Sequence, residues 1–277
     1  MPPDHPLPEL RVLPDAEGVA AAAATDIAEG LRSAIEERGV AHWATTGGSS
    51  AAPIYRLLAA PPLRDRVDWQ HVHVWWGDDR FVPSDHPASN VQPLEQILLV
   101  TGGDEGQVGR LNADAGAHGL GVVIDADNLH PVRVSEAIAH GTGTEGAAAA
   151  YAAEIASLVP AGPDGVPAFD VLVLGVGGDG HILSVFPGSE VWDRSELVVG
   201  VPAPTHIEPH IPRVTIHPRL IGAARRVLVV TTGSSKAESL GRAWTGDDVR
   251  ELPVRAARIP GATWYVDEPA ATGLVGG

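Results

Sequence analysis

The sequence contains no cysteine, and only one of its 19 lysine and arginine residues, Lys236, is a lysine. The absence of cysteine excludes disulfides and thiolate metal sites, although it is compatible with any compartment. The chain also has no apolar run long enough to span a membrane, and its N-terminal residues, M-P-P-D-H-P, lack the basic and apolar regions of a signal peptide. We therefore expect a cytoplasmic protein.

Acidic residues dominate the charge of the chain, which is −16 at pH 7. This charge argues against nucleic acid or an anionic membrane as a partner. It also makes the few cations informative, because a lysine that survives in an arginine-rich chain can be needed for function. On composition alone, a solvated lysine early in a helix is an equal alternative for Lys236.

The length of 277 residues and a hydrophobic content of 44% allow a full core, and favour one large α/β domain over residues 1–277. Strand-like runs alternate with helix-like runs along most of the chain. The strand-like runs are 10–13, 41–46, 71–76, 171–174, 227–232 and 263–266, and the helix-like runs are 15–38, 51–59, 89–100, 147–158 and 235–244. This alternation predicts an open, mostly parallel, twisted and Rossmann-like sheet with helices on both faces.

Three segments depart from the alternation. Residues 101–144 are rich in glycine, aspartate and histidine, and are expected to form an irregular surface excursion. The proline-rich residues 201–212 are expected to be a second irregular connection, and residues 268–277 a frayed tail.

The most distinctive segment, 169–188, reads F-D-V-L-V-L-G-V-G-G-D-G-H-I-L-S-V-F-P-G. A buried-strand pattern ends there in a glycine-rich turn that carries Asp179 and His181. In an α/β sheet, ligands bind at the carboxyl ends of the strands, where this imidazole and carboxylate could orient water or a substrate hydroxyl. The alternative is a tight turn whose histidine only caps local backbone. The glycine-rich context favours the catalytic interpretation.

A second loop after a predicted strand reads T-T-G-G-S-S and opens a helix. Its Gly47, Gly48, Ser49 and Ser50 could hold a phosphate with backbone N–H groups and hydroxyls, at the positive end of the helix dipole. The same sequence is also a common turn and helix cap. Because loop tips of a doubly wound sheet can share one edge, this loop could join the glycine-rich turn in one site.

The third loop, residues 75–90, reads W-W-G-D-D-R-F-V-P-S-D-H-P-A-S-N. Asp78, Asp79 and Arg80 stand directly after a strand, where two adjacent carboxylates need a compensating cation unless water solvates all three. Ser89 and Asn90 precede an apolar run and indicate a helix cap.

The fourth loop, T-T-G-S-S-K, ends at Lys236, one turn into a helix, where a cation opposes the helix dipole and so favours a nearby anion. Arg213 stands at the start of a short strand-like run and offers a planar fork that suits phosphate. On an acidic protein, these two cations beside glycine-serine loops predict a small phosphorylated substrate.

Together and in this order, the motifs resemble the 6-phosphogluconolactonase family, within the wider glucosamine-6-phosphate isomerase/6-phosphogluconolactonase group. Family members carry Asp-Glu-Arg, then Val-Pro, His and Ser-Asn. The matching residues here are Asp78, Asp79, Arg80, Val82, Pro83, His86, Ser89 and Asn90. Members also carry Gly-Asp-Gly-His-Thr-Ala-Ser-Leu-Phe-Pro-Gly, which residues 178–188 match with substitutions at Ile182, Leu183 and Val185. Asp79 replaces the usual glutamate, and G-G-S-S-A-A-P replaces the commoner Gly-Gly-Ser-Thr-Pro.

The resemblance implies hydrolysis of 6-phospho-D-glucono-1,5-lactone to 6-phosphogluconate in the oxidative pentose phosphate pathway, without a metal or an organic cofactor. It implies His181 as general acid and base, with Asp179 or Asp78 orienting the imidazole or the substrate. It further implies Arg80 as the group that stabilises the carbonyl oxygen. The residues implied for the phosphate are Gly47, Gly48, Ser49, Ser50, Arg213 and Lys236.

Deaminases of the group carry Asn-Glu-Pro after the turn, whereas Val185, Phe186 and Pro187 stand here. A phenylalanine cannot transfer protons, so the lactonase interpretation is preferred. A sugar-phosphate isomerase or deaminase, and a non-catalytic sugar-phosphate sensor, are the alternatives. We expect a monomer or a weak homo-oligomer.

The histidines outside the glycine-rich turn indicate no metal site. His71 and His73 alternate along a strand that is expected to be buried, and the chain has no H-E-x-x-H pair. His206 and His210 could pair only in a helix, which the prolines around them oppose.

Overall fold

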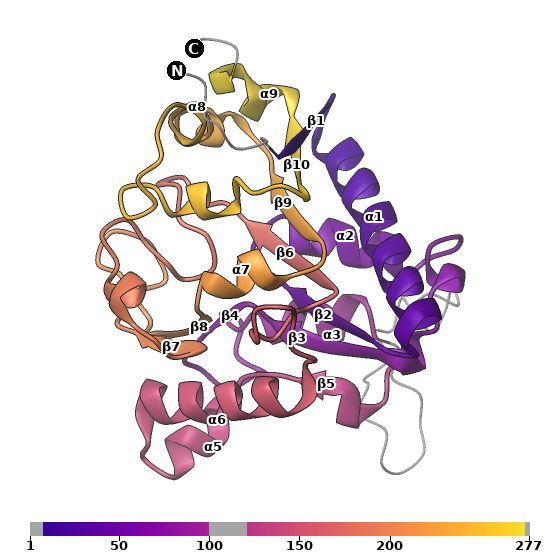
Figure 1. Ribbon diagram of the computed structural model, residues 1–277, viewed down its shortest axis with the longest axis vertical. Coiled ribbons are helices and arrows are strands. Elements are labelled where there is room, and N and C mark those ends of the chain that lie inside the picture. The colour runs from indigo at the N-terminus through magenta and orange to yellow at the C-terminus, as the bar shows by residue number, and fades with distance from the viewer. Residues whose placement is uncertain (1–7, 100–120, 275–277) are drawn as a thin grey trace.

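The computed structural model describes residues 8–99 and 121–274. Seven of the strands form one sheet in the order β1-β10-β9-β6-β2-β3-β5, and every neighbouring pair is parallel (Figure 1). They are β1 (Glu9–Leu13), β2 (Ala41–Thr45), β3 (Val72–Trp76), β5 (Leu129–His130), β6 (Val171–Gly175), β9 (Val227–Thr231) and β10 (Ala262–Asp267). The predicted α/β fold is confirmed, and each of the six strand-like runs matches one of these strands to within one residue at either end.

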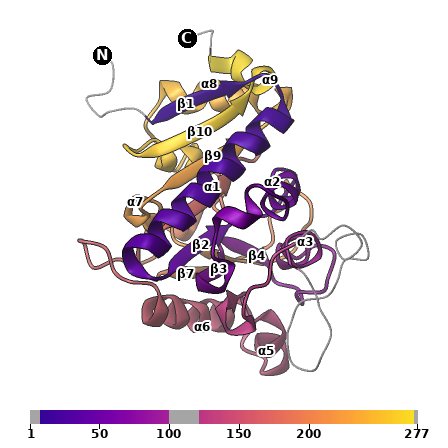
Figure 2. The ribbon, with the colours of Figure 1, turned by 90° about the vertical axis from the view of Figure 1, so that its right-hand side faces the viewer.

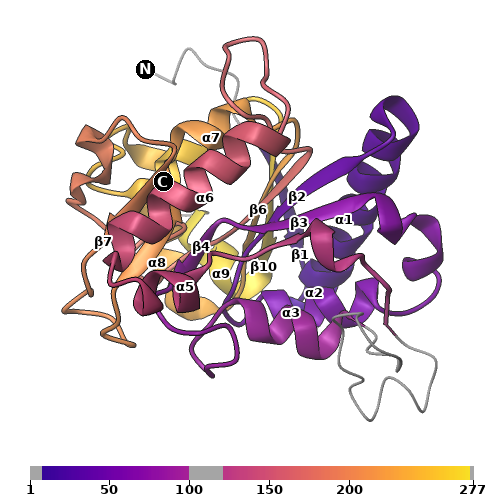
Figure 3. The ribbon, with the colours of Figure 1, turned by 90° about the horizontal axis from the view of Figure 1, so that it is seen from below.

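Helices cover both faces of this sheet (Figure 3). On one face lie α1 (Ala16–Arg38), α2 (Ala51–Leu58) and α3 (Val91–Ile97). On the other lie α5 (Val134–Ala139), α6 (Gly143–Leu158), α7 (Arg219–Ala223), α8 (Ala237–Thr245) and α9 (Glu268–Ala271). The long helix α1 crosses the sheet and contacts β10, β2 and β9 (Figure 2). All five predicted helices are present, with shifts of a few residues at their ends.

The two faces bury separate cores because successive strand residues point to opposite sides. On β6, Val171 and Val173 pack under α1, whereas Leu172 and Leu174 pack on the α6 and α8 side. All four are fully buried, which explains why this strand is an unbroken apolar run.

A smaller antiparallel sheet stands beside the carboxyl end of β3. It contains β4 (Asp78–Arg80), β8 (Arg213–Ile216) and β7 (Val198–Val201), in the order β4-β8-β7. Gly77 joins it to the main sheet, because its N–H donates to Thr45 O of β2 and its carbonyl accepts from Ile216 N of β8. Among these three, the sequence indicated only the strand at Arg213.

The prediction of an irregular surface excursion over residues 101–144 is wrong for the second half of this segment. Residues 100–120 lie outside the described residues, but β5 and α5 follow them. The strand β5 pairs with β3 through Val74–Leu129 and Trp75–His130 and so ends the main sheet. A strand of two residues is too short to produce a recognisable pattern.

The expected frayed tail at 268–277 is also wrong over its described part. Residues 268–271 form α9 and residues 272–274 a 3₁₀ turn, which packs against α8. Asp267 caps α9 by accepting from Ala270 N at 2.9 Å, and Ala270 and Ala271 are buried. Pro269 falls in the first turn, where a helix tolerates proline because the missing N–H has no intrahelical partner there.

Within the described residues, none of the helices has the length and apolar character needed to cross a membrane. Residues 202–212 contain neither helix nor strand, as expected from their prolines.

Candidate active site

One cavity of about 190 Å³ lies at the carboxyl ends of β2, β6 and β9. The strand order reverses at this point, because the chain passes from β2 to β3 and β5 on one side and returns to β6, β9 and β10 on the other. Such a switch point is where open α/β sheets bind ligands. Nine of the residues singled out in the sequence line the cavity: Gly47, Gly48, Ser49, Ser50, Asp78, Arg80, His181, Arg213 and Lys236.

Asp179 contacts His181 directly. The Nδ1 of the imidazole lies 2.5 Å from Oδ1 of Asp179, and the backbone N–H of His181 donates to the same oxygen at 3.1 Å. Burial acts to raise the pKa of the Asp179 carboxyl, but hydrogen bonds from His181 and His206 and the charge of His181 outweigh it and hold this pKa below its usual range. An ionised carboxylate only accepts, so Nδ1 of His181 carries the proton and Nε2 is left as the basic nitrogen.

Two glycines allow this arrangement. An added Cβ at Gly177 would lie 2.0 Å from the imidazole Nδ1 of His181, so only glycine leaves room for the ring. Gly180 has φ +82°, and an added Cβ would lie 2.2 Å from Leu252 Cδ1. The glycine-rich sequence is therefore a packing requirement of the turn.

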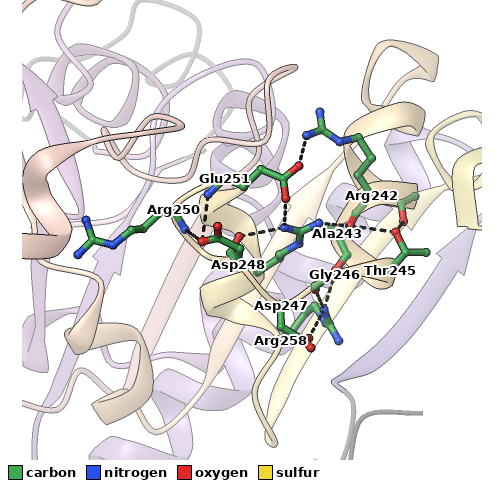
Figure 4. Close-up of polar contacts among 11 residues, drawn as sticks. Arg242, Ala243, Thr245, Gly246, Asp247, Asp248, Arg250, Glu251 and Arg258 are labelled. Carbon is green, nitrogen blue, oxygen red and sulfur yellow. Dashed lines mark hydrogen bonds and ion pairs between the residues drawn. The ribbon is translucent and has the colours of Figure 1, made fainter. Parts of the chain in front are cut away.

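Residues 246–258 support the glycine-rich turn that carries Asp179 and His181. Val254 N donates to Gly180 O at 2.9 Å. This segment is fixed to α8 by two arginines with little exposure: Arg255 donates to Arg242 O at 2.8 Å, and Arg258 donates to Ala243 O at 2.8 Å (Figure 4). The segment has no regular structure apart from a 3₁₀ turn, so these bonds define its shape.

Asp78 lies on β4 and is buried against the cavity. Its Oδ2 accepts a hydrogen bond from Ser184 Oγ at 2.6 Å. The sequence left open whether Asp78 or Asp179 contacts the imidazole, and of the two it is Asp179. Burial lowers the pKa of Arg213, and the charge of Asp78 opposes that effect.

Asp79 points away from the cavity and organises the loop that follows. Its carboxylate accepts from Asn90 N at 2.7 Å, from Arg80 N at 2.8 Å and from Ser89 Oγ at 2.9 Å. Burial raises the pKa of Asp79 to about 6, although these hydrogen bonds act in the opposite direction. Of the two residues expected to cap α3, Asn90 stands at the N-cap without a side-chain capping bond, whereas Ser89 Oγ accepts from Val91 N at 3.1 Å.

Arg80 and Arg213 supply two cations to the cavity. Arg80 donates to Ala88 O at 2.6 Å, and Arg213 donates to Pro209 O at 3.2 Å. The Nε of each is buried and has no hydrogen-bond partner among the described residues. The guanidinium of Arg213 lies 5.6 Å from the centroid of the Phe186 ring. Both side chains line the cavity, and guanidinium groups suit an anionic ligand.

Lys236 is the third cation of the cavity and ends a 3₁₀ turn after β9. Burial lowers its pKa, and the charge of Asp179 opposes that effect. Across the cavity, Gly48 has φ +80°, and Ser50 makes no capping hydrogen bond at the start of α2. Its hydroxyl is thus not engaged in capping the helix.

Two residues of the site were not singled out in the sequence. His206, in the proline-rich connection, has its Nε2 3.0 Å from Oδ2 of Asp179, and no local pattern could indicate a contact 27 positions away. Ser184 is fully buried and donates to Asp78. Because Ser184 lies inside the 178–188 motif, the sequence did offer a signal that it belongs to the site.

A separate set of histidines lies under α6 and does not line the cavity. Nδ1 of His73 is 2.9 Å from Nε2 of His130, whose Nδ1 is 2.8 Å from Glu154. The His42 ring is 4.9 Å from that of His73. Burial lowers the pKa of all three histidines, that of His42 to about 3. His71, expected on the same buried strand, is instead exposed in a 3₁₀ turn beside Asp68.

Comparisons with known proteins identify the family of the chain. The family described as glucosamine-6-phosphate isomerases/6-phosphogluconolactonase matches residues 14–265. The chain belongs to this family. The resemblance inferred from the motifs is thereby confirmed.

Curated relatives match over nearly their whole length. The 6-phosphogluconolactonase of Streptomyces coelicolor is 35% identical over 272 residues, which cover 96% of this chain and 95% of the relative. That of Mycobacterium tuberculosis is 30% identical over 267 residues, with 96% and 98% covered. Among solved structures, 6-phosphogluconolactonase from Trypanosoma cruzi superposes with a TM-score of 0.77 at 25% identity, covering 98% of this chain and 99% of that one.

Proposed function

We propose that this protein hydrolyses 6-phospho-D-glucono-1,5-lactone to 6-phosphogluconate, the reaction that the names of its relatives indicate. The observation that supports this most directly is the His181–Asp179 pair, which stands at a cavity lined by the cations Arg80, Arg213 and Lys236. The pair provides a base. The cations can bind a phosphate and stabilise a carbonyl oxygen that gains negative charge.

In the proposed first step, Nε2 of neutral His181 takes a proton from water as the water oxygen bonds to the lactone carbonyl carbon. Asp179 holds the imidazole in the required tautomer and stabilises the imidazolium that forms. Arg80 stabilises the negative charge on the carbonyl oxygen. In the second step, the bond from the carbonyl carbon to the ring oxygen breaks, and the imidazolium protonates that oxygen. The products are a carboxylic acid, which ionises, and a free hydroxyl.

The substrate's phosphate is assigned to Arg213, Lys236 and the loop Gly47–Ser50. A charge held far from the reacting carbon contributes binding energy that positions the carbonyl against His181. The place of Arg213 in the cavity lining supports this assignment, because the planar fork of a guanidinium matches phosphate oxygens.

The deaminase alternative lacks a proton-transfer group at its expected place. Phe186 stands there, with its ring centroid 4.7 Å from that of His181, so the position packs against the base instead of adding a second carboxylate. The fold itself does not separate the two activities.

The deciding experiment measures acid release from 6-phosphogluconolactone generated in place, above its spontaneous hydrolysis. We expect catalysed acid release, and no ammonium release from glucosamine-6-phosphate. Ammonium release would instead establish the deaminase. Tight binding of the phosphorylated lactone without turnover would establish the sensor, and either result would overturn the proposal.

A further inference from the structure

The carboxylate of Asp179 joins two imidazoles. Its Oδ1 lies 2.5 Å from Nδ1 of His181, and its Oδ2 lies 3.0 Å from Nε2 of His206. His206 belongs to the irregular connection between β7 and β8, so the second imidazole comes from a different loop than the base. Both oxygens of the carboxylate are thereby occupied, and its rotation about the side chain is restricted from two directions.

Phe186 links the same two imidazoles by packing. Its ring centroid lies 4.7 Å from that of His181 and 5.6 Å from that of His206, which meets it edge-on. The guanidinium of Arg213 lies over the same phenyl ring. His206 is therefore held in place by an aromatic contact in addition to its hydrogen bond.

Lys236 lies beside the turn that carries Asp179: a Cβ added at Gly178 would be 3.9 Å from Lys236 Nζ. Burial lowers the pKa of Lys236, and the charge of Asp179 opposes that effect. A carboxylate released on its Oδ2 side could turn toward the ammonium. That movement would withdraw the acceptor from His181 and a cation from the phosphate.

We propose that His206 is a positioning residue, which holds Oδ2 of Asp179 so that Oδ1 stays on Nδ1 of His181 and Lys236 stays available to the substrate. This inference rests on the proposed function for its kinetic consequence, but not for its geometry. His206 acts through Asp179 and takes no part in the proton transfers. The chemistry it requires is a single N–H donor at the place of Nε2.

The experiment compares His206→Ala with His206→Gln, whose amide can place a donor near the position of Nε2. We expect His206→Ala to lower kcat about tenfold, the lower end of what a hydrogen bond to a charged group contributes. We expect KM to change less than kcat, and His206→Gln to recover most of the lost rate. An unchanged kcat in folded His206→Ala, or no recovery with glutamine, would overturn the proposal.

The matched control is His210→Asn in the same loop. His210 is as exposed as His206, with 49% and 50% of the side chains accessible, but it contacts Glu208 and Pro204 O instead of Asp179. Asparagine keeps a donor near Nδ1 for the bond to Pro204. We expect this variant to retain the wild-type kcat. A loss as large as that of His206→Ala would show that the loop as a whole matters and would contradict a specific role for His206.

A double-mutant cycle tests whether His206 acts through Asp179. In the Asp179→Asn background, the further change His206→Ala should lower kcat less than twofold, because the group to be positioned is already gone. Independent, multiplicative effects would exclude the proposed route.

A readout without turnover separates this inference from the proposed function. Imidazole ¹⁵N shifts of His181 should report the Nδ1-protonated tautomer in the wild type and a mixture of tautomers in His206→Ala. If the wild type fails to hydrolyse the lactone, the proposed function is wrong, while the ¹⁵N spectra still decide the role of His206. Identical His181 spectra in the two proteins would refute that role.

Discussion

Arg80 lies directly opposite Arg213 in the antiparallel β4–β8 pair. Like charges at paired positions repel each other across a ladder, and each of these two guanidinium groups has a buried Nε without a partner among the described residues. Asp78 on the same strand compensates only part of this charge. The uncompensated positive charge therefore favours binding of an anion at this site.

Inorganic phosphate should consequently stabilise the protein. We expect Tm to rise with phosphate concentration, because the ligand binds only the folded state. At a few times Kd, the free energy of unfolding should increase by on the order of 1 kcal/mol. Arg213→Gln should reduce this rise strongly. The measurement is thermal unfolding in phosphate at constant ionic strength, with chloride as the matched control. An equal rise in chloride would indicate general screening and would contradict an anion site.

Replacing His181 should remove the base. Substitution by alanine should lower kcat by roughly 10²–10⁴, the usual contribution of a positioned acid–base group, with little change in fold. Circular dichroism and Tm establish that the variant is folded. Near-normal turnover in a folded His181→Ala protein would rule out the assignment.

Lys236 should act on binding more than on chemistry, because its charge attracts the phosphate before and during the reaction. Lys236→Ala should chiefly raise KM and lower kcat/KM by the equivalent of about 1.5–3 kcal/mol. A lactone without phosphate is the control substrate. If that lactone loses as much kcat/KM as the phosphorylated one, Lys236 does not bind the phosphate.

Stability should fall as the solution is acidified from pH 7 to pH 5. The folded protein holds His42, His73 and His130 with lowered pKa values, whereas the unfolded chain titrates them near 6.5. The unfolded state then binds more protons, so each histidine contributes stability above about pH 6.5 that is lost on acidification. The loss is at most about 1.4 kcal/mol per pH unit per histidine.

Asp79 changes stability in the opposite direction. Its pKa of about 6 in the folded protein exceeds the ordinary value of about 3.9, so its contribution to stability is present at low pH and is lost as the pH rises through 6. Urea unfolding at pH 7, 6 and 5 should show a net loss in the wild type, a shallower loss in His42→Asn and a steeper loss in Asp79→Asn. Equal slopes in all three proteins would contradict these assignments.

Chelation should leave activity intact. The proposed base, its carboxylate and the cations around the substrate are all side chains of this protein, so no step requires a metal ion. Exhaustive EDTA treatment followed by the lactonase assay tests this expectation. Loss of activity with recovery on adding Zn²⁺ would contradict the proposed mechanism.

The parts of the fold that the sequence predicted are those with long local patterns. The strands β6 and β9 each begin with four large apolar residues, and α1 repeats small apolar residues over 23 positions. The strand β5 has two residues and β4 has three, so their pairing is decided by neighbours in space and leaves no period in the sequence. The helix at 268–271 was missed because residues near the end of the sequence were expected to fray.

The same distinction applies to the candidate site. Nine of its residues could be named because each of their loops directly follows or enters a strand, and strand ends meet at one edge. His206 could not be assigned to the site, because its partner Asp179 lies in another loop and the connection that carries His206 has no regular structure. The sequence also did not indicate which of the neighbours Asp78 and Asp79 faces the cavity, because the orientation of β4 decides this.

The segment 246–258 has one more consequence. It is bonded to Gly180 beside the base and, through Arg255 and Arg258, to α8, which begins directly after Lys236. His181 and Lys236 are thus attached to one connected part of the protein. Thermal motion that displaces this body carries both groups in the same direction, so their separation varies less than the position of either one.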